Sequence, residues 1–473
     1  MSVMGILNVA SKALVAQKTA IDVTGQNIAN VGTAGYSRQS VVLENSGGSV
    51  DYLNVTGDGV RIAAIQRSKD AFLQSQTLSE TSTNGKQSTL QNAMAQVEPL
   101  FTDTTTTGLG TSLQNFYSSW QDLANNPQGS AERQAVLSNG QTVVDNFHQL
   151  SQSLNDQMTQ ANSSLATTTD TISTSLKQVA DLNAQIKILE SGGGSANQLR
   201  DSRDLLLKGL AKKVGISSQE QSDGTVTVTL GSSSGGPTLV SGTTASILGV
   251  DSSNPAASAI MLKGSAGDSG TDVTSLISAD AKSGELGGAL QVRDQTLPGF
   301  LGTLDSIASN LATQVNTLHS AGTGLTGSTG LDFFTTPAGS SGYSGLMALN
   351  ITSPNDVAAS GTPSTGTGDN TNALALAALK SGSITVAGSQ TTVPGLYGAL
   401  VGNVGLAVQN AAQGVTQSST MLTQLDNLRE SSVGVNMDEE LSNLISFQKG
   451  YEGAAKLIVT GQEMIDTVLN MVK

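Results

Sequence analysis

Three consecutive carboxylates, Asp438-Glu439-Glu440, are the first residues of this sequence to examine for acid–base or metal chemistry. They follow Asn436 and open a stretch with helical periodicity. Acidic side chains in the first turn of a helix complement the helix dipole and its unpaired N–H groups, and asparagine is a favoured capping residue. We therefore expect a capped helix start here rather than a metal site or a catalytic acid.

The two histidines, His148 and His319, are the next candidates for general bases or metal ligands. Neither has an acidic residue or a second histidine at ligand spacing, so we expect both at the surface or at a helix end. The chain has no cysteine, which excludes disulfides, thiolate catalysis and cysteine-based metal sites. We predict no cofactor, no metal and no enzymatic activity.

Other polar and glycine-rich segments also lack a complete chemical motif. Gly108-Leu-Gly110 has neither the remaining glycine nor the preceding strand of a dinucleotide-binding fingerprint. Ser191-Gly-Gly-Gly-Ser195 is typical of a flexible connection. The mixed charges of Arg200, Asp201, Arg203 and Asp204 indicate a solvated helix face with i,i+3 and i,i+4 pairs.

The charge and composition of the chain limit the classes of partner that it can bind. The 473-residue chain has a net charge of −14, which argues against nucleic acid or an anionic membrane as a partner, since both require a basic surface. No apolar run approaches the ~18–20 residues of a membrane span, so we expect no membrane insertion. The first residues lack a basic segment and Lys12 interrupts their apolar run, which does not fit a cleaved signal peptide.

Apolar residues recur every seven positions at both ends of the chain. A repeat of this kind keeps one narrow stripe facing a partner along a whole helix. We predict helices over residues 3–31 and 437–472, and we expect their apolar columns to form an assembly surface. The N-terminal column is Leu7, Leu14, Ile21 and Ile28, and the C-terminal column is Leu444, Tyr451, Ile458, Ile465 and Val472.

The second column of each terminal helix is weaker. It carries Ala10, Gln17 and Thr24 near the N-terminus, and Gln448 and Gln462 near the C-terminus. Polar residues at core positions weaken a coiled coil but specify its register and partner; these helices could equally turn a mixed face to water. An isolated helix whose apolar stripe is incomplete is only marginally stable in water. We therefore expect both ends of the chain to be poorly ordered in the monomer and to become ordered on assembly.

The interior shows the same helical pattern, interrupted once by strands. Helical periodicity runs from about residue 68 to 189 with breaks at Pro99 and at 125–127, and it returns at 287–318, 372–379 and 401–425. A short β segment is expected around the turn Gly57-Asp58-Gly59. Residues 225–230 alternate with period two and indicate a β-rich insertion.

These elements predict a mainly α fold with an inserted β domain, in an elongated multi-domain chain whose N- and C-terminal helices pair in coiled-coil bundles. We expect a terminal domain of residues 1–45 and 432–473. A long-helix domain would span 46–213 and 280–431, and the inserted β domain 214–279. If the N- and C-terminal helices meet in one bundle, the molecule should be a rod. We then expect the inserted β domain at the end of the rod that lies opposite the termini.

Three separated segments carry a family resemblance. Asn27-Ile-Ala-Asn30 followed by the run to Gln39 resembles the N-terminal signature of the axial proteins of bacterial flagella, the rod, hook and hook-associated family. Residues 432–441 are similar to the closing helix of this family. Residues 292–300 and 331–334 resemble its hook-associated members, which form the junction between hook and filament.

The resemblance implies a structural, non-enzymatic subunit of the flagellum. It implies type III export without a cleaved signal peptide, an extracellular place at the hook–filament junction, and self-association into a ring or helical layer. The implied partners are the hook protein, a second junction protein or flagellin, and an export chaperone on residues 437–472. We predict that Asn27, Asn30, Tyr36 and Arg38 join the two apolar columns in the assembly interface.

Three alternatives remain open at this point. The chain could be another axial subunit of the hook or rod type, although the resemblance over 292–334 argues against it. It could be an enzyme on a helical scaffold, but the β region has no HExxH motif. It could also be a secreted adhesin-like protein that binds through its β insert.

Overall fold

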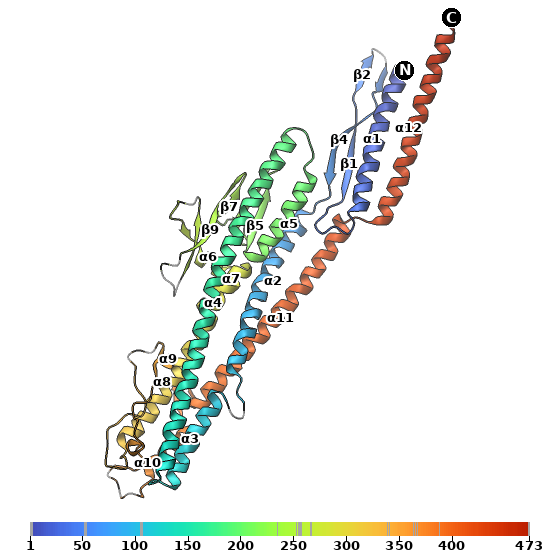
Figure 1. The fold of residues 1–473 in the computed structure, drawn as a ribbon. Coiled ribbons are helices and arrows are strands. Elements are labelled where there is room, and N and C mark those ends of the chain that lie inside the picture. The colour runs from blue at the N-terminus through green and yellow to red at the C-terminus, as the bar shows by residue number, and fades with distance from the viewer. Residues whose placement is uncertain are drawn as a thin grey trace.

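Long helices run along one axis and make the protein a rod, with both termini at the same end (Figure 1). The computed structural model describes residues 3–471 except 52–53, 105–106, 234, 252, 254–257, 265–266, 338, 340, 363, 365, 367 and 387, and the side chains of 48–57. The predicted mainly α fold with a β insertion is confirmed.

Two terminal helices and a hairpin form one end of the rod, here called the terminal unit. Helix α1 (Val3–Ala29) lies against α12 (Met437–Met471), and the predicted bounds differ from the observed ones by one or two residues. Strand β1 (Gln39–Asn45) pairs with β4 (Val60–Arg67), and β2 (Gly48–Asp51) pairs with β3 (Asn54–Gly57), in one antiparallel ribbon beside α1.

The expected turn at residues 57–59 is wrong. Asp51 pairs with Asn54 in the β2–β3 ladder, whereas the N–H of Asp58 donates to the carbonyl of Gly47 at 3.2 Å. Gly47 and Gly59 both have positive φ, 30° and 90°. The two glycines therefore lie in the interruption between the β1–β4 and β2–β3 ladders, where a residue with a Cβ would be strained.

The middle of the rod is built on α4 (Ser130–Ser191), which spans 62 residues. Its packing partners are α2 (Ala71–Val97), α5 (Asn197–Lys213) and α7 (Gly284–Gln291), while α11 (Val393–Val433) lies along α2. The predicted breaks are confirmed, because a 3₁₀ turn at Glu98–Phe101 contains Pro99 and a loop separates Asn125 from Ser130. Four apolar residues spaced seven apart along α4 are fully buried, namely Leu165, Ile172, Val179 and Ile186.

The predicted β insertion packs on the second half of α4. Strands β5 (Ile216–Glu220), β6 (Val226–Leu230), β7 (Thr238–Ser241) and β8 (Thr244–Ala245) form one sheet in that order. A second sheet contains β9 (Ile247–Asp251), β10 (Ala259–Lys263) and β11 (Thr271–Asp272), and α6 (Thr274–Ala279) follows. The insertion lies beside the middle of the rod in Figure 1, so its expected place at the far end is wrong. The reason is the length of α4, which continues past the sheets in the direction away from the termini.

The far end is a helical bundle with short loops over it. It contains α3 (Leu109–Asn125), the first half of α4, α8 (Leu297–Ala321) and α10 (Thr371–Ala378). A π turn at Val292–Thr296 joins α7 to α8, and the region between α8 and α10 holds α9 (Tyr343–Leu346) and a 3₁₀ turn at Pro354–Asp356. After α10 come a 3₁₀ turn at Leu379–Ser381 and the hairpin of β12 (Ile384–Val386) and β13 (Ser389–Thr391).

His319 lies in the last turn of α8, at a helix end as expected, but it is buried and not at the surface. Its Nδ1 donates to the carbonyl of Leu331 at 2.6 Å, and its Nε2 accepts from the N–H of Ala358 at 3.0 Å. Those bonds require the neutral imidazole, and burial lowers its pKa below the ordinary value. His148 stays half-buried and contacts the Met347 carbonyl.

Two apolar cores stabilise the rod, one in the far bundle and one between α4, α5 and the sheets. Among the described residues, no side chain of α1, the β1–β4 ribbon or α12 belongs to either core. The terminal unit is therefore connected to the rod by something other than a shared apolar core.

Candidate assembly site at the terminal unit

The α1–α12 pair is antiparallel and closely packed at small residues. A Cβ added at Gly461 would lie 2.7 Å from Leu7, and one added at Gly450 would lie 2.8 Å from Gln17. At the opposite end of the pair, Asn27 contacts Glu440. The two helices thus meet along their whole shared length.

Within one chain, α1 buries Ala10 and Thr24 of its weaker column and half-buries Gln17. Ala10 and Thr24 are 0% and 3% exposed, and Ala16 and Ala20 beside them are also buried. The stronger predicted column is only half-buried, and it consists of Leu7, Leu14, Ile21 and Ile28. The large apolar side chains therefore lie at the edge of the pair, where they remain partly accessible.

Helix α12 is nearly uncovered. Of its described residues only Glu440, Ala454 and Gly461 are buried, because α1 is the one helix packed along it. Leu444, Ile458 and Ile465 of the predicted column are half-buried and Tyr451 is exposed, whereas Val472 lies outside the described residues. Other large apolar side chains point to solvent, namely Leu441, Ile445, Leu457, Val459, Met464, Val468, Leu469 and Met471.

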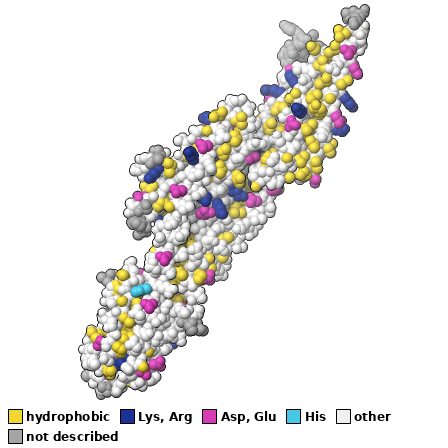
Figure 2. Space-filling model, viewed as in Figure 1, with side chains coloured by type: hydrophobic (Ala, Val, Ile, Leu, Met, Phe, Trp, Pro, Cys, Tyr) yellow, Lys and Arg dark blue, Asp and Glu magenta, His cyan; other side chains and the backbone are white. Residues whose placement is uncertain are grey.

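Figure 2 shows the consequence on the surface, where hydrophobic side chains follow the terminal end of the rod. The exposed fractions of Ile445, Val468 and Leu469 reach 56–60%. Exposed apolar patches on this scale mark interaction surfaces in soluble proteins.

The signature residues gather at the base of the terminal unit. The amide of Asn27 uses all four of its hydrogen-bonding positions. Its Oδ1 accepts from the Tyr36 hydroxyl at 2.9 Å and the Gln39 N–H at 3.0 Å. Its Nδ2 donates to the Gln39 carbonyl at 2.8 Å and to Glu440 Oε2 at 2.9 Å. This side chain therefore fixes the loop after α1 against the start of α12.

Arg38 completes the contact with α12. Its Nε donates to Glu440 Oε1 at 2.7 Å, and its Nη2 donates to Glu439 at 2.8 Å. Although burial opposes its charge, these carboxylates raise the pKa of Arg38 above its ordinary value. Its backbone N–H also bonds the carbonyl of Val433, the last residue of α11. We call Asn27, Tyr36, Arg38 and Glu440 the joint network.

Asn30 is not part of the joint network. Its side chain donates to the Gln26 carbonyl at 2.9 Å and accepts from the Thr33 hydroxyl at 3.2 Å. It therefore closes the turn after α1, a local role that asparagine side chains often have.

The carboxylates at 438–440 have two roles. Asn436 Oδ1 accepts the N–H of Asp438 at 3.0 Å, so the predicted helix cap is confirmed. Glu440, however, is only 2% exposed and contacts two segments far away in sequence. Its place at the fourth helical residue carries no signal that distinguishes it from its exposed neighbours, so sequence reasoning missed it.

The mixed charge cluster on α5 is not a solvated face as expected, because Asp201 and Arg203 are buried and Arg200 and Asp204 are half-buried. Arg67 at the end of β4 donates to Asp201 at 2.8 Å and pairs with Asp204 at 2.7 Å. The N–H of Ser37 donates to Asp201 at 3.3 Å. The partners come from the terminal unit, so local spacing on α5 could not reveal them.

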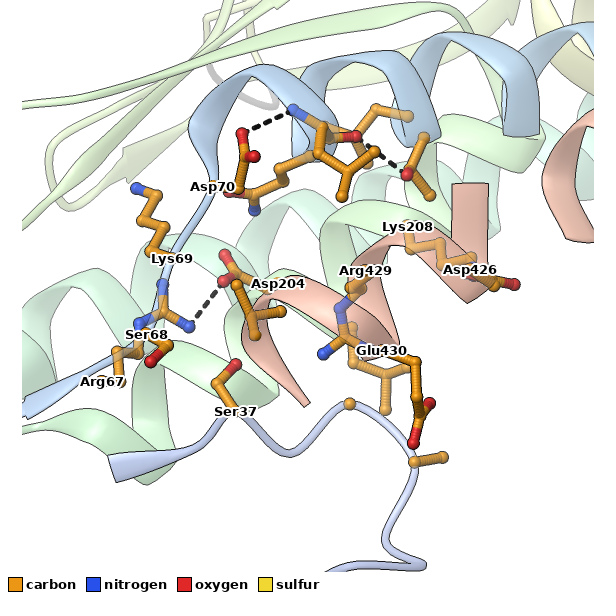
Figure 3. Close-up of a pocket in the computed structure, with 18 residues that line it drawn as sticks. Ser37, Arg67, Ser68, Lys69, Asp70, Asp204, Lys208, Asp426, Arg429 and Glu430 are labelled. Atoms are coloured by element: carbon orange, nitrogen blue, oxygen red, sulfur yellow. Dashed lines mark hydrogen bonds and ion pairs between the residues drawn. The ribbon is translucent and has the colours of Figure 1, made fainter. Parts of the chain in front are cut away.

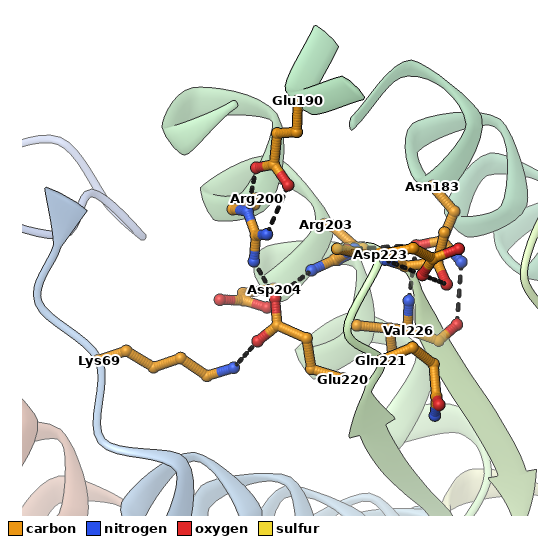
Figure 4. A network of polar contacts seen from close by, with 12 residues as sticks. Lys69, Asn183, Glu190, Arg200, Arg203, Asp204, Glu220, Gln221, Asp223 and Val226 are labelled. Carbon is orange, nitrogen blue, oxygen red and sulfur yellow. Dashed lines mark hydrogen bonds and ion pairs between the residues drawn. The ribbon is translucent and has the colours of Figure 1, made fainter. Parts of the chain in front are cut away.

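Arg203 of this cluster faces the β insertion (Figure 4). It donates to Asn183 Oδ1 at 2.9 Å and to the Gly224 carbonyl at 2.8 Å, and burial lowers its pKa to about 10. Arg200 pairs with Glu190 and Glu220, and Lys69 also reaches Glu220. Charged contacts therefore run from the linker before α2, through α5, to strand β5.

Comparison with known proteins identifies the chain. The family model described as the flagellar hook-associated protein FlgK helical domain matches residues 94–334, more than half of the sequence. The chain belongs to the FlgK family. Two further models match its ends: a flagella basal body rod protein over residues 7–36, and the C-terminal region of the flagellar basal body rod FlgEFG proteins over 429–471.

Named relatives match this FlgK-family chain over almost its whole length. Flagellar hook-associated protein 1 of Bacillus subtilis is 29% identical, over 98% of this chain and 97% of the relative. The protein of the same name in Escherichia coli is 27% identical, over 98% and 99%. The flagellar hook junction protein FlgK from Burkholderia pseudomallei has a similar fold, with a TM-score of 0.66 at 20% identity, over 76% of this chain and all of that one.

The two family matches at the ends of the chain meet at the joint network. Both rod-protein models cover segments that meet in it, since Tyr36 lies at the end of one and Glu440 inside the other. The FlgK helical domain covers the rod between them, which disfavours a hook or rod subunit. The relatives are named as flagellar hook-associated proteins, not as enzymes. Within the described part of the chain, no helix is long and apolar enough to cross a membrane.

Proposed function

We propose that this protein is a structural subunit of the junction between the flagellar hook and filament, and that it assembles through α1 and α12. The uncovered apolar surface of α12 carries the proposal, since a helix that buries three of its described residues is incomplete as a monomer. Family membership and the names of the full-length relatives support it.

In this proposal, copies of the chain pack their terminal units together into a ring or helical layer. The half-buried columns of α1 and α12, with Leu14, Ile21, Ile458 and Ile465 among them, would be buried between copies. The joint network would keep each pair in a fixed relation to its rod. The hook protein and a second junction protein or flagellin would lie on the two sides of the layer.

The proposed function also implies how the chain is exported to the junction. The chain would be exported without a cleaved signal peptide and would act outside the cell. A cytoplasmic chaperone would cover residues 437–472 before export, since this segment exposes the apolar surface. We also propose the predicted division into a terminal domain, a long-helix domain and the β domain at 214–279.

Deletion of residues 464–473 in the native host tests the function. Cells should build hooks but release flagellin monomers into the medium, because the deleted segment holds exposed Met464, Val468 and Leu469. A control deletion within residues 363–368, outside the terminal unit, should leave filaments attached. Normal filaments in the α12 deletion would contradict the assignment.

A further inference from the structure

Helix α11 presents an exposed surface without charge along the middle of the rod. No Asp, Glu, Lys, Arg or His occurs between Val393 and Leu425, whereas α5, less than half as long, contains three Lys, two Arg and two Asp. The charged residues of α11 begin at Asp426, beside the cavity that this helix shares with α2 and α5 (Figure 3). Charged residues are depleted in the cores of protein interfaces. This part of α11 is therefore a candidate interface.

The surface consists of amide and apolar side chains. In the middle of the rod α2 is the main neighbour of α11, and one residue in seven is buried, namely Val404, Ala411, Ser418 and Leu425. On the uncovered side, the charge-free face consists of exposed amides seven residues apart and the apolar residues beside them, namely Asn403, Asn410, Gln417 and Gln424 with Leu406 and Met421. Within the described part of the chain, the four amides make no side-chain hydrogen bond. Their N–H groups remain available to an acceptor outside the chain.

Helix α4 presents acceptors instead. A row of exposed hydroxyl groups, here called the hydroxyl row, follows its middle, and each hydroxyl donates to the backbone carbonyl four residues earlier; the row consists of Thr159, Ser163, Thr167, Thr171 and Thr174. A hydroxyl whose proton is already used can only accept a further bond. The exposed carboxylates along the row, Asp156 and Asp170, are acceptors as well.

The charge-free face and the hydroxyl row lie at the same level of the rod, on opposite sides. Gly414 of α11 lies against Gln87 of α2, and Gly288 of α7 lies against Thr89 of α2. The turn after α7 then bonds Asn162 of α4 at 3.2 Å. Helices α2 and α7 therefore lie between α11 and α4 (Figure 1). In a ring or helical layer, one surface of each copy contacts a different surface of the next copy, and two surfaces on opposite sides of a rod meet this condition.

We propose that the charge-free face of α11 packs against the hydroxyl row of α4 in a second copy of the chain. The amide N–H groups of the first copy donate to hydroxyl and carboxylate oxygens of the second. Each copy carries both the donors and the acceptors, so a series of copies satisfies both surfaces without a further protein. The inference rests on the proposed self-assembly, and it adds a contact between rods to the contact between terminal units.

Cysteine crosslinking in assembled flagella tests this contact, because the natural chain has no cysteine. The native host would express two single-cysteine copies, one with Asn410→Cys and one with Gln160→Cys, Thr167→Cys or Thr174→Cys. These three exposed positions on α4 are seven residues apart and cover the possible registers. A short bismaleimide should join the two copies in at least one of the three pairs. Ser202→Cys, at an exposed position on α5, is the control and should not be joined to Asn410→Cys.

The other outcomes of the crosslinking contradict the inference. Dimers formed by Asn410→Cys alone would show that two α11 helices meet. Crosslinks from Asn410→Cys only to another flagellar protein would identify a different partner, and no crosslink at all would show that the face is free. If the wild-type chain were absent from the junction, the proposed function itself would fail, which is a distinguishable result.

Two substitutions of Gln417 test the hydrogen-bonding pattern. Gln417→Glu replaces the amide donors with acceptors that face hydroxyl lone pairs and carboxylates, so the yield of the Asn410→Cys crosslink should fall about tenfold. Gln417→Lys keeps donors at this position and should change the yield by less than about twofold. Equal yields in the two variants would refute the contact between donors and acceptors. Both variants should unfold at the wild-type temperature, because Gln417 is exposed in the chain.

Discussion

Asn27 Nδ2 donates a hydrogen bond of 2.9 Å to Glu440 Oε2, although 413 residues separate the two side chains in the sequence. Both groups are almost completely inaccessible to solvent. The terminal unit shares no apolar core with the rod among the described residues. The position of α12 relative to the signature loop therefore depends on a small number of polar contacts.

Glu440→Gln should loosen the start of α12. The substitution removes the charge that pairs with Arg38, and hydrogen bonds to charged groups contribute about 1.5–3 kcal/mol. Hydrogen exchange of the α12 amides near residue 440 should quicken roughly ten- to hundredfold. Glu439→Gln is the control, since that side chain is 56% exposed and its pair with Arg38 is worth less than about 1 kcal/mol. Equal exchange in both variants would show that the buried contact is unimportant.

Gly461→Leu should separate α1 from α12. A Cβ at this position would lie 2.7 Å from Leu7, and overpacking costs about 1–3 kcal/mol. Gly453→Leu is a matched control on the same helix, since no atom lies within 4 Å of its added Cβ and glycine lowers helix stability. Exchange protection of α1 should fall in the first variant and stay or rise in the second. The opposite order would contradict the close approach of the helices.

Asn183→Ala should detach the β insertion from α4. The buried amide accepts from Arg203 and the Val226 N–H, and it donates to the carbonyls of Val226 and Gly242. Unpaired buried groups cost about 1–3 kcal/mol each, so the free energy of unfolding in urea should fall by about 3 kcal/mol or more. Asn155→Ala, an exposed position on the same helix, should change it by less than about 0.5 kcal/mol.

His319 should make the far end of the rod sensitive to acid. Its folded pKa is lowered from 6.5, so the unfolded chain binds a proton more readily than the folded chain. Stability is therefore complete above pH 6.5 and falls as the pH drops below it, by at most about 1.4 kcal/mol per pH unit. The fluorescence of Trp120, the single tryptophan, reports unfolding because the two rings lie 6.2 Å apart.

Two variants isolate the histidine responsible. His319→Gln should abolish this pH dependence between pH 7.5 and 5, whatever its own stability, while His148→Gln should retain it. An unchanged slope in His319→Gln would assign the effect to other groups.

The sequence by itself determined the helices, their ends and the family signature, because these depend on local spacing and on turn residues such as Pro99 and Asn436. The tertiary structure alone decided which side of each helix is covered. A seven-residue repeat defines stripes on α1, but only the position of α12 and the β1–β4 ribbon explains why Ala10 is buried and Leu14 is half-exposed. Likewise, the sequence does not distinguish Asp201 and Glu440 from surface carboxylates. In the structure, Arg67 binds Asp201 and Arg38 binds Glu440, and both arginines come from distant segments of the chain. Burial depends on what packs over a residue, and one helix's periodicity does not contain that information.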